Sequence, residues 1–226
     1  MKTLSIIIPC YNEKNTIDIL LSKIDRLNIP NWTIEVVIVD DGSKDGTRDL
    51  LKKYSNKFKI IFHERNGGKG TAVKTGIDHA TGDYMIIQDA DLEYEPSEIK
   101  SLVEELERNP KNIIYGSRNL HHIKRKGMYI PRMGVWFITK QFNFLFNSKL
   151  TDLWTCYKLF PREVADQFVS GGFDSELIFS ARIAKKGYRI SEVPISHKPR
   201  SFKEGKKIKY RDGIKGIIVL LREFVK

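Results

Sequence analysis

Three acidic residues follow one apolar segment of the chain at a spacing that suits metal binding. Asp89 and Asp91 stand two residues apart after the strand-like segment 84–88, and Glu93 follows two residues later. If the chain turns there, two or three carboxylate oxygens can converge, and such ligands suit Mg²⁺ or Mn²⁺, which would hold a diphosphate. An Asp-x-Asp pair alone is more typical of a solvated turn. Its position after a buried strand, beside a second acidic strand end, favours the metal site.

A pair of acids also closes the preceding apolar segment 35–39. Asp40 and Asp41 stand directly after it, and Ser43 and Asp45 follow before a helical segment. Ser43 or Asp45 can cap that helix, so the two adjacent acids exceed what capping requires. One of them is therefore free to accept a hydrogen bond from a nucleotide base or a ribose.

The first apolar segment, 4–9, ends in a similar way. Pro9 is followed by Tyr11, which could stack on a base, and by Glu13, which could accept a hydrogen bond from a sugar hydroxyl. The alternative is structural, with a tucked aromatic ring and an acid that caps the next helix. The local sequence favours neither interpretation over the other.

The elements that must position these residues alternate between strand and helix. Strand-like segments are predicted at 4–9, 35–39, 59–63, 84–88 and 112–115, and helices at 16–27, 45–54, 71–80 and 96–108. Continuously apolar strands that alternate with helices indicate an α/β fold, with a mostly parallel central sheet covered by helices on both faces. Ligands of such folds bind at the carboxyl ends of the strands, where the acids above are found.

The second half of the chain departs from this alternation. An aromatic and basic stretch covers 128–150, followed by a strand at 155–160, a helix at 174–186, a strand at 188–195, a basic stretch at 197–211 and an amphipathic helix at 212–225. Neither a Pro/Ser-rich linker nor an internal repeat divides the sequence. We therefore predict one domain over residues 1–226, with a first half at 1–118 and a second half at 119–226.

Net charge separates the same two halves. The chain holds 39 Lys and Arg and 28 Asp and Glu; residues 1–118 carry a balance of −2 and residues 119–226 a balance of +13. Such asymmetry indicates an anionic partner, which could be a nucleic acid, a phospholipid surface or a phosphorylated substrate. A solvated lysine-rich surface is the alternative that composition leaves open.

Composition excludes several other classes. With 41% hydrophobic and 30% charged residues, the chain is neither disordered nor fibrous. The longest purely apolar runs are short, such as 217–221, whereas a membrane-spanning helix needs about 20 apolar residues. We expect neither such a helix nor a signal peptide. Two cysteines, Cys10 and Cys156, are too few for a disulfide framework and favour a reducing, cytoplasmic compartment.

Taken together in order, these motifs resemble those of the inverting family 2 glycosyltransferases with a GT-A fold. The resemblance rests on Pro9-x-Tyr11-Asn12-Glu13, residues 39–47, Asn66-x-Gly68-Lys69-Gly70-x-Ala72 and Asp89-Ala90-Asp91. More narrowly, the chain is similar to the dolichyl/polyprenyl-phosphate mannose and glucose synthases, through residues 116–118, Thr151-Asp152, residues 173–176, residues 192–195, and Arg200 with Lys206. The resemblance spans essentially the whole chain.

The resemblance implies a role for each matching residue. The nucleotide-sugar-binding residues would be Pro9, Tyr11, Glu13, Val39, Asp41, Asp89, Ala90, Asp91, Arg118, Arg200 and Lys206. Mg²⁺ or Mn²⁺ would bind Asp91 and Glu93, with Asp89 nearby. Phosphates of the donor or of the lipid acceptor would be bound by Arg118, Arg200 and Lys206. Asp89, Asp91, Arg118 and Asp152 would be the catalytic residues. Guanidinium groups match phosphate geometry, and the last two cations fall in the basic stretch.

The implied reaction moves a hexose from a nucleotide diphosphate sugar to a polyprenyl monophosphate. That acceptor is largely ionised at neutral pH, so it needs no strong general base. Mannose is favoured, and both GDP-mannose and UDP-glucose stay open as donors, because the run after Arg200 departs from the pattern of many mannose synthases. Glu93 stands where many relatives have Gln or Ser, which leaves the preferred metal open.

Two rival functions use other parts of the chain. A family 2 enzyme with a saccharide acceptor would need a carboxylate base, which Asp152 could supply. A nucleic-acid-binding module would use the basic second half, but it has no use for three acidic strand ends. We therefore expect no nucleic-acid partner.

The aromatic and basic segment 128–147 fits an amphipathic helix at a membrane surface. Its rings would enter the headgroup region while lysines and arginines meet lipid phosphates, and the helix at 212–225 could act in the same way. A core helix packed on the sheet is the alternative for both segments. The first interpretation predicts a peripheral enzyme at the cytoplasmic face of a membrane, on its own or with a membrane-anchoring partner.

Overall fold

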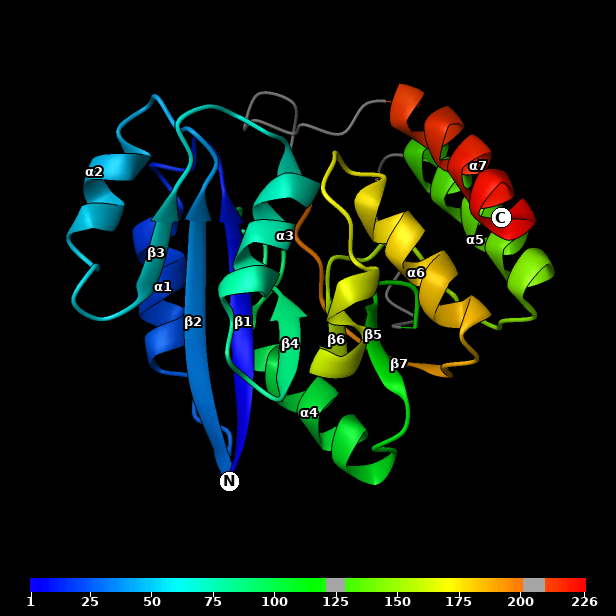
Figure 1. Cartoon of the computed structure of the whole chain (residues 1–226), viewed down its shortest axis with the longest axis horizontal. Helices are drawn as coiled ribbons and strands as arrows, with labels where there is room; N and C mark the ends of the chain where they lie inside the picture. Colours follow the sequence, from blue (N-terminus) through cyan, green and yellow to red (C-terminus); the bar gives the residue numbers. More distant parts are fainter. Residues whose placement is uncertain (121–128, 201–209) are drawn as a thin grey trace.

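A seven-stranded sheet forms the centre of the protein in the computed structural model, which describes residues 1–120, 129–200 and 210–226. Its strands are β1 (Lys2–Cys10), β2 (Trp32–Asp40), β3 (Lys59–Phe62), β4 (Tyr84–Ile87), β5 (Ile113–Ser117), β6 (Lys158–Pro161) and β7 (Ile190–Pro194). They lie in the order β3-β2-β1-β4-β6-β5-β7 (Figure 1). All the predicted strands are present.

The pairing of these strands is mostly parallel, as the sequence predicts. β1 pairs in parallel with β2 and β4, β2 with β3, and β5 with β7. β6 runs antiparallel to both of its neighbours, β4 and β5. A strand from the second half of the chain therefore lies between two strands of the first half.

Helices cover both faces of the sheet, which confirms the predicted layers. One face packs against α1 (Ile17–Asp25), α2 (Thr47–Lys52) and α4 (Ile99–Arg108). The other packs against α3 (Lys69–His79), α5 (Tyr129–Phe146), α6 (Ser175–Lys185) and α7 (Tyr210–Val225). A 3-10 helix at Pro96–Glu98 leads into α4, and another at Arg162–Gln167 follows β6.

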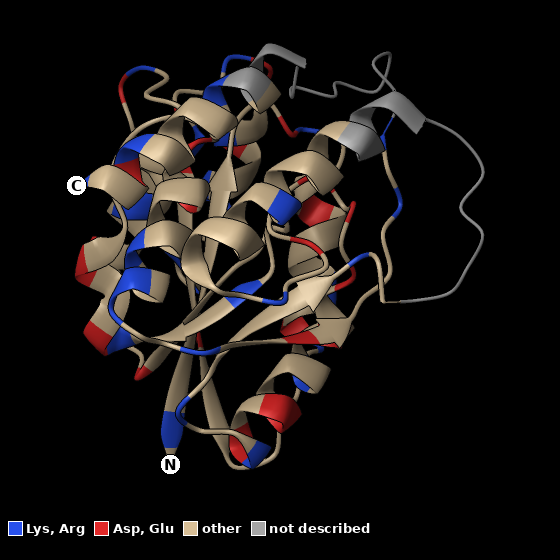
Figure 2. Cartoon of the chain, turned by 90° about the vertical axis from the view of Figure 1, so that its right-hand side faces the viewer, with Lys and Arg blue, Asp and Glu red and all other residues tan. Residues whose placement is uncertain are grey.

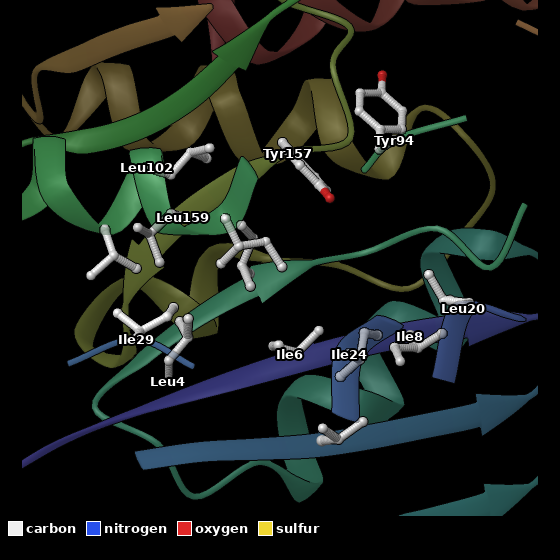
Figure 3. Packing of buried hydrophobic residues seen from close by; sticks show 14 of the residues in the cluster. Leu4, Ile6, Ile8, Leu20, Ile24, Ile29, Tyr94, Leu102, Tyr157 and Leu159 are labelled. Carbon is white, nitrogen blue, oxygen red and sulfur yellow. The ribbon is translucent and has the colours of Figure 1, made fainter. Parts of the chain in front are cut away.

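The alternation of side chains along β1 explains why its sequence is continuously apolar. Ile6 and Ile8 face the layer of α1 and α4, whereas Ile7 faces the layer of α3. Figure 3 shows the first of these layers, where Leu20 and Ile24 of α1 lie near β1. Because both faces are buried there, the consecutive positions Ile6, Ile7 and Ile8 all carry apolar side chains, whereas the buried hydroxyl of Ser5 donates to Glu35.

α5 and α7 pack against each other at one side of the molecule. α5 carries both buried and exposed large apolar side chains. Ile138 and Phe142 of α5 are buried in the core, as the core interpretation predicts. Trp136 and Phe144, on the same helix, are 60% and 88% exposed. Figure 2 views this side, where the ribbons of both helices are mostly uncharged.

The exposed apolar face continues onto α7. Its exposed large side chains are Ile218, Leu221, Phe224 and Val225, and those of α5 are Trp136, Phe137 and Phe144. We call these seven side chains the α5/α7 face. Within the described residues, neither helix is long and apolar enough to cross a membrane, and the same holds for the other helices.

Candidate active site

The carboxyl ends of β1, β2 and β4 open into one cleft of about 290 Å³. Among the predicted site residues, the cleft is lined by Pro9, Tyr11, Glu13, Asp41, Asp89, Ala90, Asp91, Glu93, Arg118 and Arg200. Val39 and Asp152 are completely buried and do not line it. Lys206 lies outside the described residues. The structure therefore brings together residues that are up to 191 positions apart in the sequence.

The two acids at the end of β2 have different surroundings. Asp40 is turned away from the cleft and pairs with Arg48 at 2.9 Å. Asp41 lines the cleft, with only 3% of its side chain exposed. The sequence indicated that one acid of the pair was free for a ligand, and the structure assigns that position to Asp41.

The Asp41 carboxylate is held by two backbone amides and an imidazole. Oδ1 accepts hydrogen bonds from the backbone N–H of Gly67 and from Nδ1 of His63, both at 2.9 Å, and Oδ2 accepts one from the backbone N–H of Gly68 at 2.9 Å. Gly68 has φ +91° and ψ 157°, a conformation that essentially only glycine adopts. The glycine-rich loop thus aims two amides at one carboxylate.

The Asp89 carboxylate, at the end of β4, is neutralised by a lysine instead. Lys69 Nζ lies 2.7 Å from Asp89 Oδ1, 2.9 Å from Glu176 Oε1 and 3.0 Å from Cys156 Sγ. Burial alone would lower the pKa of Lys69, but the three neighbours raise it well above the usual value. Burial also raises the pKa of the Cys156 thiol. Lys69 is therefore a charged group inside the cleft.

A second buried lysine continues this network. Lys158 of β6 is fully buried and lies 3.2 Å from the other carboxylate oxygen of Glu176. Glu176, in the first turn of α6, thus stands between two ammonium groups. The chain Asp89–Lys69–Glu176–Lys158 joins β4, α3, α6 and β6, so it couples the cleft to the second half of the sheet.

Asp91 is paired with a residue from far along the chain. Arg200 places Nη2 3.1 Å from Asp91 Oδ2 and 3.1 Å from Glu13 Oε1, and its Nη1 lies 2.9 Å from Glu13 Oε2. Burial first, and then the charges of Asp89 and Glu93, raise the pKa of Asp91 to about 7 despite Arg200. Burial and the two neighbouring carboxylates therefore both oppose the ionised form of Asp91.

Glu93 binds the segment that carries Arg200. Its carboxylate contacts Nε2 of His197 at 3.0 Å and accepts a hydrogen bond from the backbone N–H of Arg200 at 2.9 Å. Burial would raise the pKa of Glu93, but these two partners hold it below its usual value. In this structure Glu93 holds residues 197–200 against the cleft, a role that the sequence did not indicate.

Arg118, just beyond β5, is fixed by Asp152. Its Nε and Nη2 donate to the two oxygens of Asp152 at 2.6 and 2.7 Å, and Nη2 also donates to the carbonyl oxygen of Trp154 at 3.0 Å. Burial would raise the pKa of Asp152, but Arg118 lowers it. The Asp152 carboxylate is completely buried, paired with Arg118 and outside the cleft, so in this structure it orients Arg118 rather than facing an acceptor as a base.

Charge decides whether a divalent cation fits the cleft. Among the described residues the lining holds six carboxylates and only three cations. A diphosphate, itself an anion, would be repelled unless another positive charge were present. No three potential ligands converge on one point among residues 1–120, 129–200 and 210–226. The oxygen donors and the excess negative charge fit Mg²⁺ or Mn²⁺. The predicted ligands Asp89, Asp91 and Glu93 all line the cleft, and Glu93 is paired there with His197.

Sequence reasoning missed the roles of several lining residues. Lys69 was quoted as part of the glycine-rich motif and received no role, although it reaches Asp89. Glu176 entered only as part of the run 173–176, and Trp154, Phe173 and Tyr94 received no role, although all four line the cleft. A lysine next to three glycines was the one local signal that could have identified Lys69.

The fold is that of the GT-A class. The structure of glucosyl-3-phosphoglycerate synthase from Mycobacterium tuberculosis, in complex with Mn²⁺, UDP-glucose and phosphoglyceric acid, aligns with a TM-score of 0.75 at 18% identity. The alignment covers 99% of this chain and 80% of that one. This likeness confirms the predicted fold class.

The chain belongs to glycosyl transferase family 2, whose model matches residues 5–169. It is 37% identical over 116 residues to the dolichol-phosphate mannosyltransferase of Pyrococcus furiosus. That alignment covers 50% of this chain and 32% of the relative. It is 28% identical over 226 residues to the human dolichyl-phosphate beta-glucosyltransferase. That alignment covers 86% of this chain and 67% of the relative. The family assignment made from the motifs is thus confirmed.

Proposed function

We propose that the protein transfers a hexose from a nucleotide diphosphate sugar to a polyprenyl monophosphate, with inversion at the anomeric carbon. The observation that carries the proposal is the cleft, in which six carboxylates and three cations meet at the carboxyl ends of the strands. Two relatives named for dolichol phosphate support the lipid acceptor. Their sugars differ, so mannose, which the sequence favours, and glucose are the hexoses to test.

The donor would lie along the cleft with its diphosphate near Asp89 and Asp91. A bound Mg²⁺ or Mn²⁺, held by Asp91 with Asp89, would supply charge that stabilises the leaving nucleoside diphosphate. Pro9, Tyr11, Asp41 and Ala90 would line the nucleoside and sugar part. Val39 supports this pocket from inside the sheet, where it is completely buried.

The acceptor phosphate would be the nucleophile. One of its ionised oxygens forms the new bond to the anomeric carbon while the bond to the donor diphosphate breaks, and no proton needs to be removed. Arg118, fixed by Asp152, would hold this phosphate in line with the bond that breaks. Arg200 and Lys206 would add positive charge from the basic stretch.

We further propose that the α5/α7 face lies against the membrane that holds the lipid acceptor. The seven exposed apolar side chains lie in the half of the chain that carries the net charge of +13. Apolar rings in the headgroup region and lysines at anionic lipids are the usual combination at a membrane surface. In this scheme residues 1–118 bind the donor and residues 119–226 of the same domain meet the acceptor.

The transfer itself tests the function. Purified protein with Mn²⁺, a nucleotide diphosphate hexose and a polyprenyl phosphate should form a lipid-linked hexose, and Asp91→Asn should lower the rate at least about 100-fold. Glu95→Gln is the matched control, because Glu95 pairs with Lys23 outside the cleft and should stay active. Transfer to a saccharide but not to the lipid phosphate would overturn the proposal.

Vesicle binding tests the membrane contact. Liposomes that contain anionic lipid should co-sediment the wild-type protein, and replacing Phe144 and Trp136 together with serine should reduce the bound fraction severalfold. Both side chains are largely exposed, so folding should be unaffected. Equal binding of wild type and double variant would refute this orientation.

A further inference from the structure

The protein itself fills most of the hydrogen-bonding capacity of Asp41. A carboxylate offers about four acceptor positions, two on each oxygen. Among the described residues three donors occupy them: His63 and the Gly67 amide on Oδ1, and the Gly68 amide on Oδ2. One position on Oδ2 is left for a ligand in the cleft.

We infer that the cleft discriminates against guanine in favour of uracil, and that His63 sets this selectivity by occupying Oδ1 of Asp41. The inference rests on the proposed function, because it assigns the nucleotide of the same donor. A uracil ring has a single N–H between two carbonyl groups, so it needs one acceptor. Guanine presents an N–H and an amino group side by side, and the pair needs both oxygens of a carboxylate.

The other bases differ from guanine in the same respect. Cytosine and adenine can donate one amino N–H to Oδ2, so the one remaining acceptor position separates guanine from the other bases. Uracil directs its ring N–H at Oδ2. The carbonyl groups that flank this N–H then need hydrogen-bond donors. Asn66 can supply one of them.

Asn66 supplies that donor. Its side-chain oxygen accepts a hydrogen bond from the Gly68 backbone N–H at 3.1 Å, which orients the amide and leaves its NH₂ group for a ligand. Asn66 also lines the cleft together with Asp41 and Tyr11. One acceptor beside one donor matches the N–H and the adjacent carbonyl of uracil.

His63 determines how the carboxylate is held. The ring must donate through Nδ1, since an ionised carboxylate only accepts, and Nε2 lies 3.0 Å from Thr75 Oγ1. The backbone N–H of His63 donates to the Asp40 carbonyl at 2.8 Å, which places the ring directly after β3. Without the imidazole, the Gly67 and Gly68 amides would still hold the carboxylate, but one acceptor position on Oδ1 would be open to a second donor on the base.

Calorimetric titration of the full chain with UDP and with GDP, each with Mg²⁺, tests the inference. Wild type should bind UDP at least about tenfold more tightly, because the guanine amino group would lack an acceptor. His63→Leu removes the donor but keeps bulk, and it should narrow the ratio of the two affinities severalfold. His63→Gln retains an N–H donor and should keep the wild-type preference.

The outcomes separate this inference from the function on which it rests. Equal or tighter binding of GDP by wild type overturns the base assignment and leaves the transferase proposal intact, with a guanosine donor. Binding of neither nucleotide overturns both. If His63→Leu fails to fold, the wild-type ratio still decides the base. An unchanged ratio in a folded His63→Leu protein overturns the role of His63.

Discussion

The two ends of the cleft hold their carboxylates in different ways. At the β2 end, Asp41 is bound by two backbone amides and an imidazole, all from residues within 27 positions of it. At the β4 end, Asp91 pairs with Arg200 from 109 positions away, and Lys69 links Asp89 to Glu176 on α6. Hydrogen bonds from nearby residues thus hold the carboxylate at the β2 end. Ion pairs with distant segments of the chain hold the carboxylates at the β4 end.

This difference matches what each end would bind under the proposed function. Two backbone amides and an imidazole hold Asp41 in one orientation, which would leave one of its acceptor positions for a base. At the β4 end the proposed ligand is a charged diphosphate, and buried carboxylates there need cations before any ligand arrives. Buried ion pairs are strongly destabilising when one partner is removed, because the other is left uncompensated. Removing single residues should therefore affect the two ends unequally.

The largest effect is expected for Lys69→Met at the β4 end. The substitution leaves Asp89 and Glu176 without the ammonium group between them, and should lower the free energy of unfolding by about 3 kcal/mol or more. Lys74→Met is the control on the same helix, because Lys74 pairs with the exposed Asp78 and should change stability by less than about 0.5 kcal/mol. Urea unfolding measures both, and equal effects would contradict the comparison.

Asp152→Asn should have the next largest effect and should depend on pH. It leaves the Arg118 guanidinium without its counter-charge, which should remove about 2–3 kcal/mol of stability at pH 7. Arg118 holds the pKa of Asp152 below its ordinary value of 3.8, so the carboxylate stabilises the fold above about pH 4. That contribution is lost as the pH falls through the lowered pKa.

The difference between wild type and Asp152→Asn should therefore be complete at pH 7 and smaller at pH 3 in urea unfolding curves. Asp166→Asn is the control, since Asp166 is 68% exposed and lies 4.0 Å from Lys186. Its effect should stay below about 0.5 kcal/mol at both pH values. A difference for Asp152→Asn that is the same at both pH values would argue against the ion pair as its source.

The smallest of the three effects is expected for Gly68→Ala at the β2 end. A Cβ atom at Gly68 would lie 2.9 Å from the carbonyl oxygen of Gly171, and the backbone conformation there disfavours alanine. We expect a loss of about 1–3 kcal/mol and weaker nucleotide binding, because the amide that holds Asp41 moves. Gly213→Ala, in α7 with no neighbour within 4 Å, should instead be neutral or stabilising. Thermal unfolding with and without UDP compares the two variants. A similar loss of stability in Gly68→Ala and Gly213→Ala would refute the conformational argument.

Much of this arrangement could be predicted from local sequence. The apolar runs of β1 and β2, the acids that follow them and the glycine-rich loop all lie in short segments whose pattern indicates both element and position. The α5 segment was ambiguous between core and membrane face, since a helix that is aromatic on several sides satisfies both patterns. In the structure Ile138 and Phe142 pack inward while Trp136 and Phe144 remain exposed.

The sequence by itself determined the α/β fold class, the family and the strand ends where carboxylates would gather, because strand and helix periodicities and turn residues act over a few positions. Only the tertiary structure decided that Lys69 and Arg200 neutralise Asp89 and Asp91, that Asp152 is buried behind Arg118, and that β6 lies between β4 and β5. Ion pairs form between whichever charges the packed sheet brings within a few ångströms, and no local pattern records which distant residue that will be.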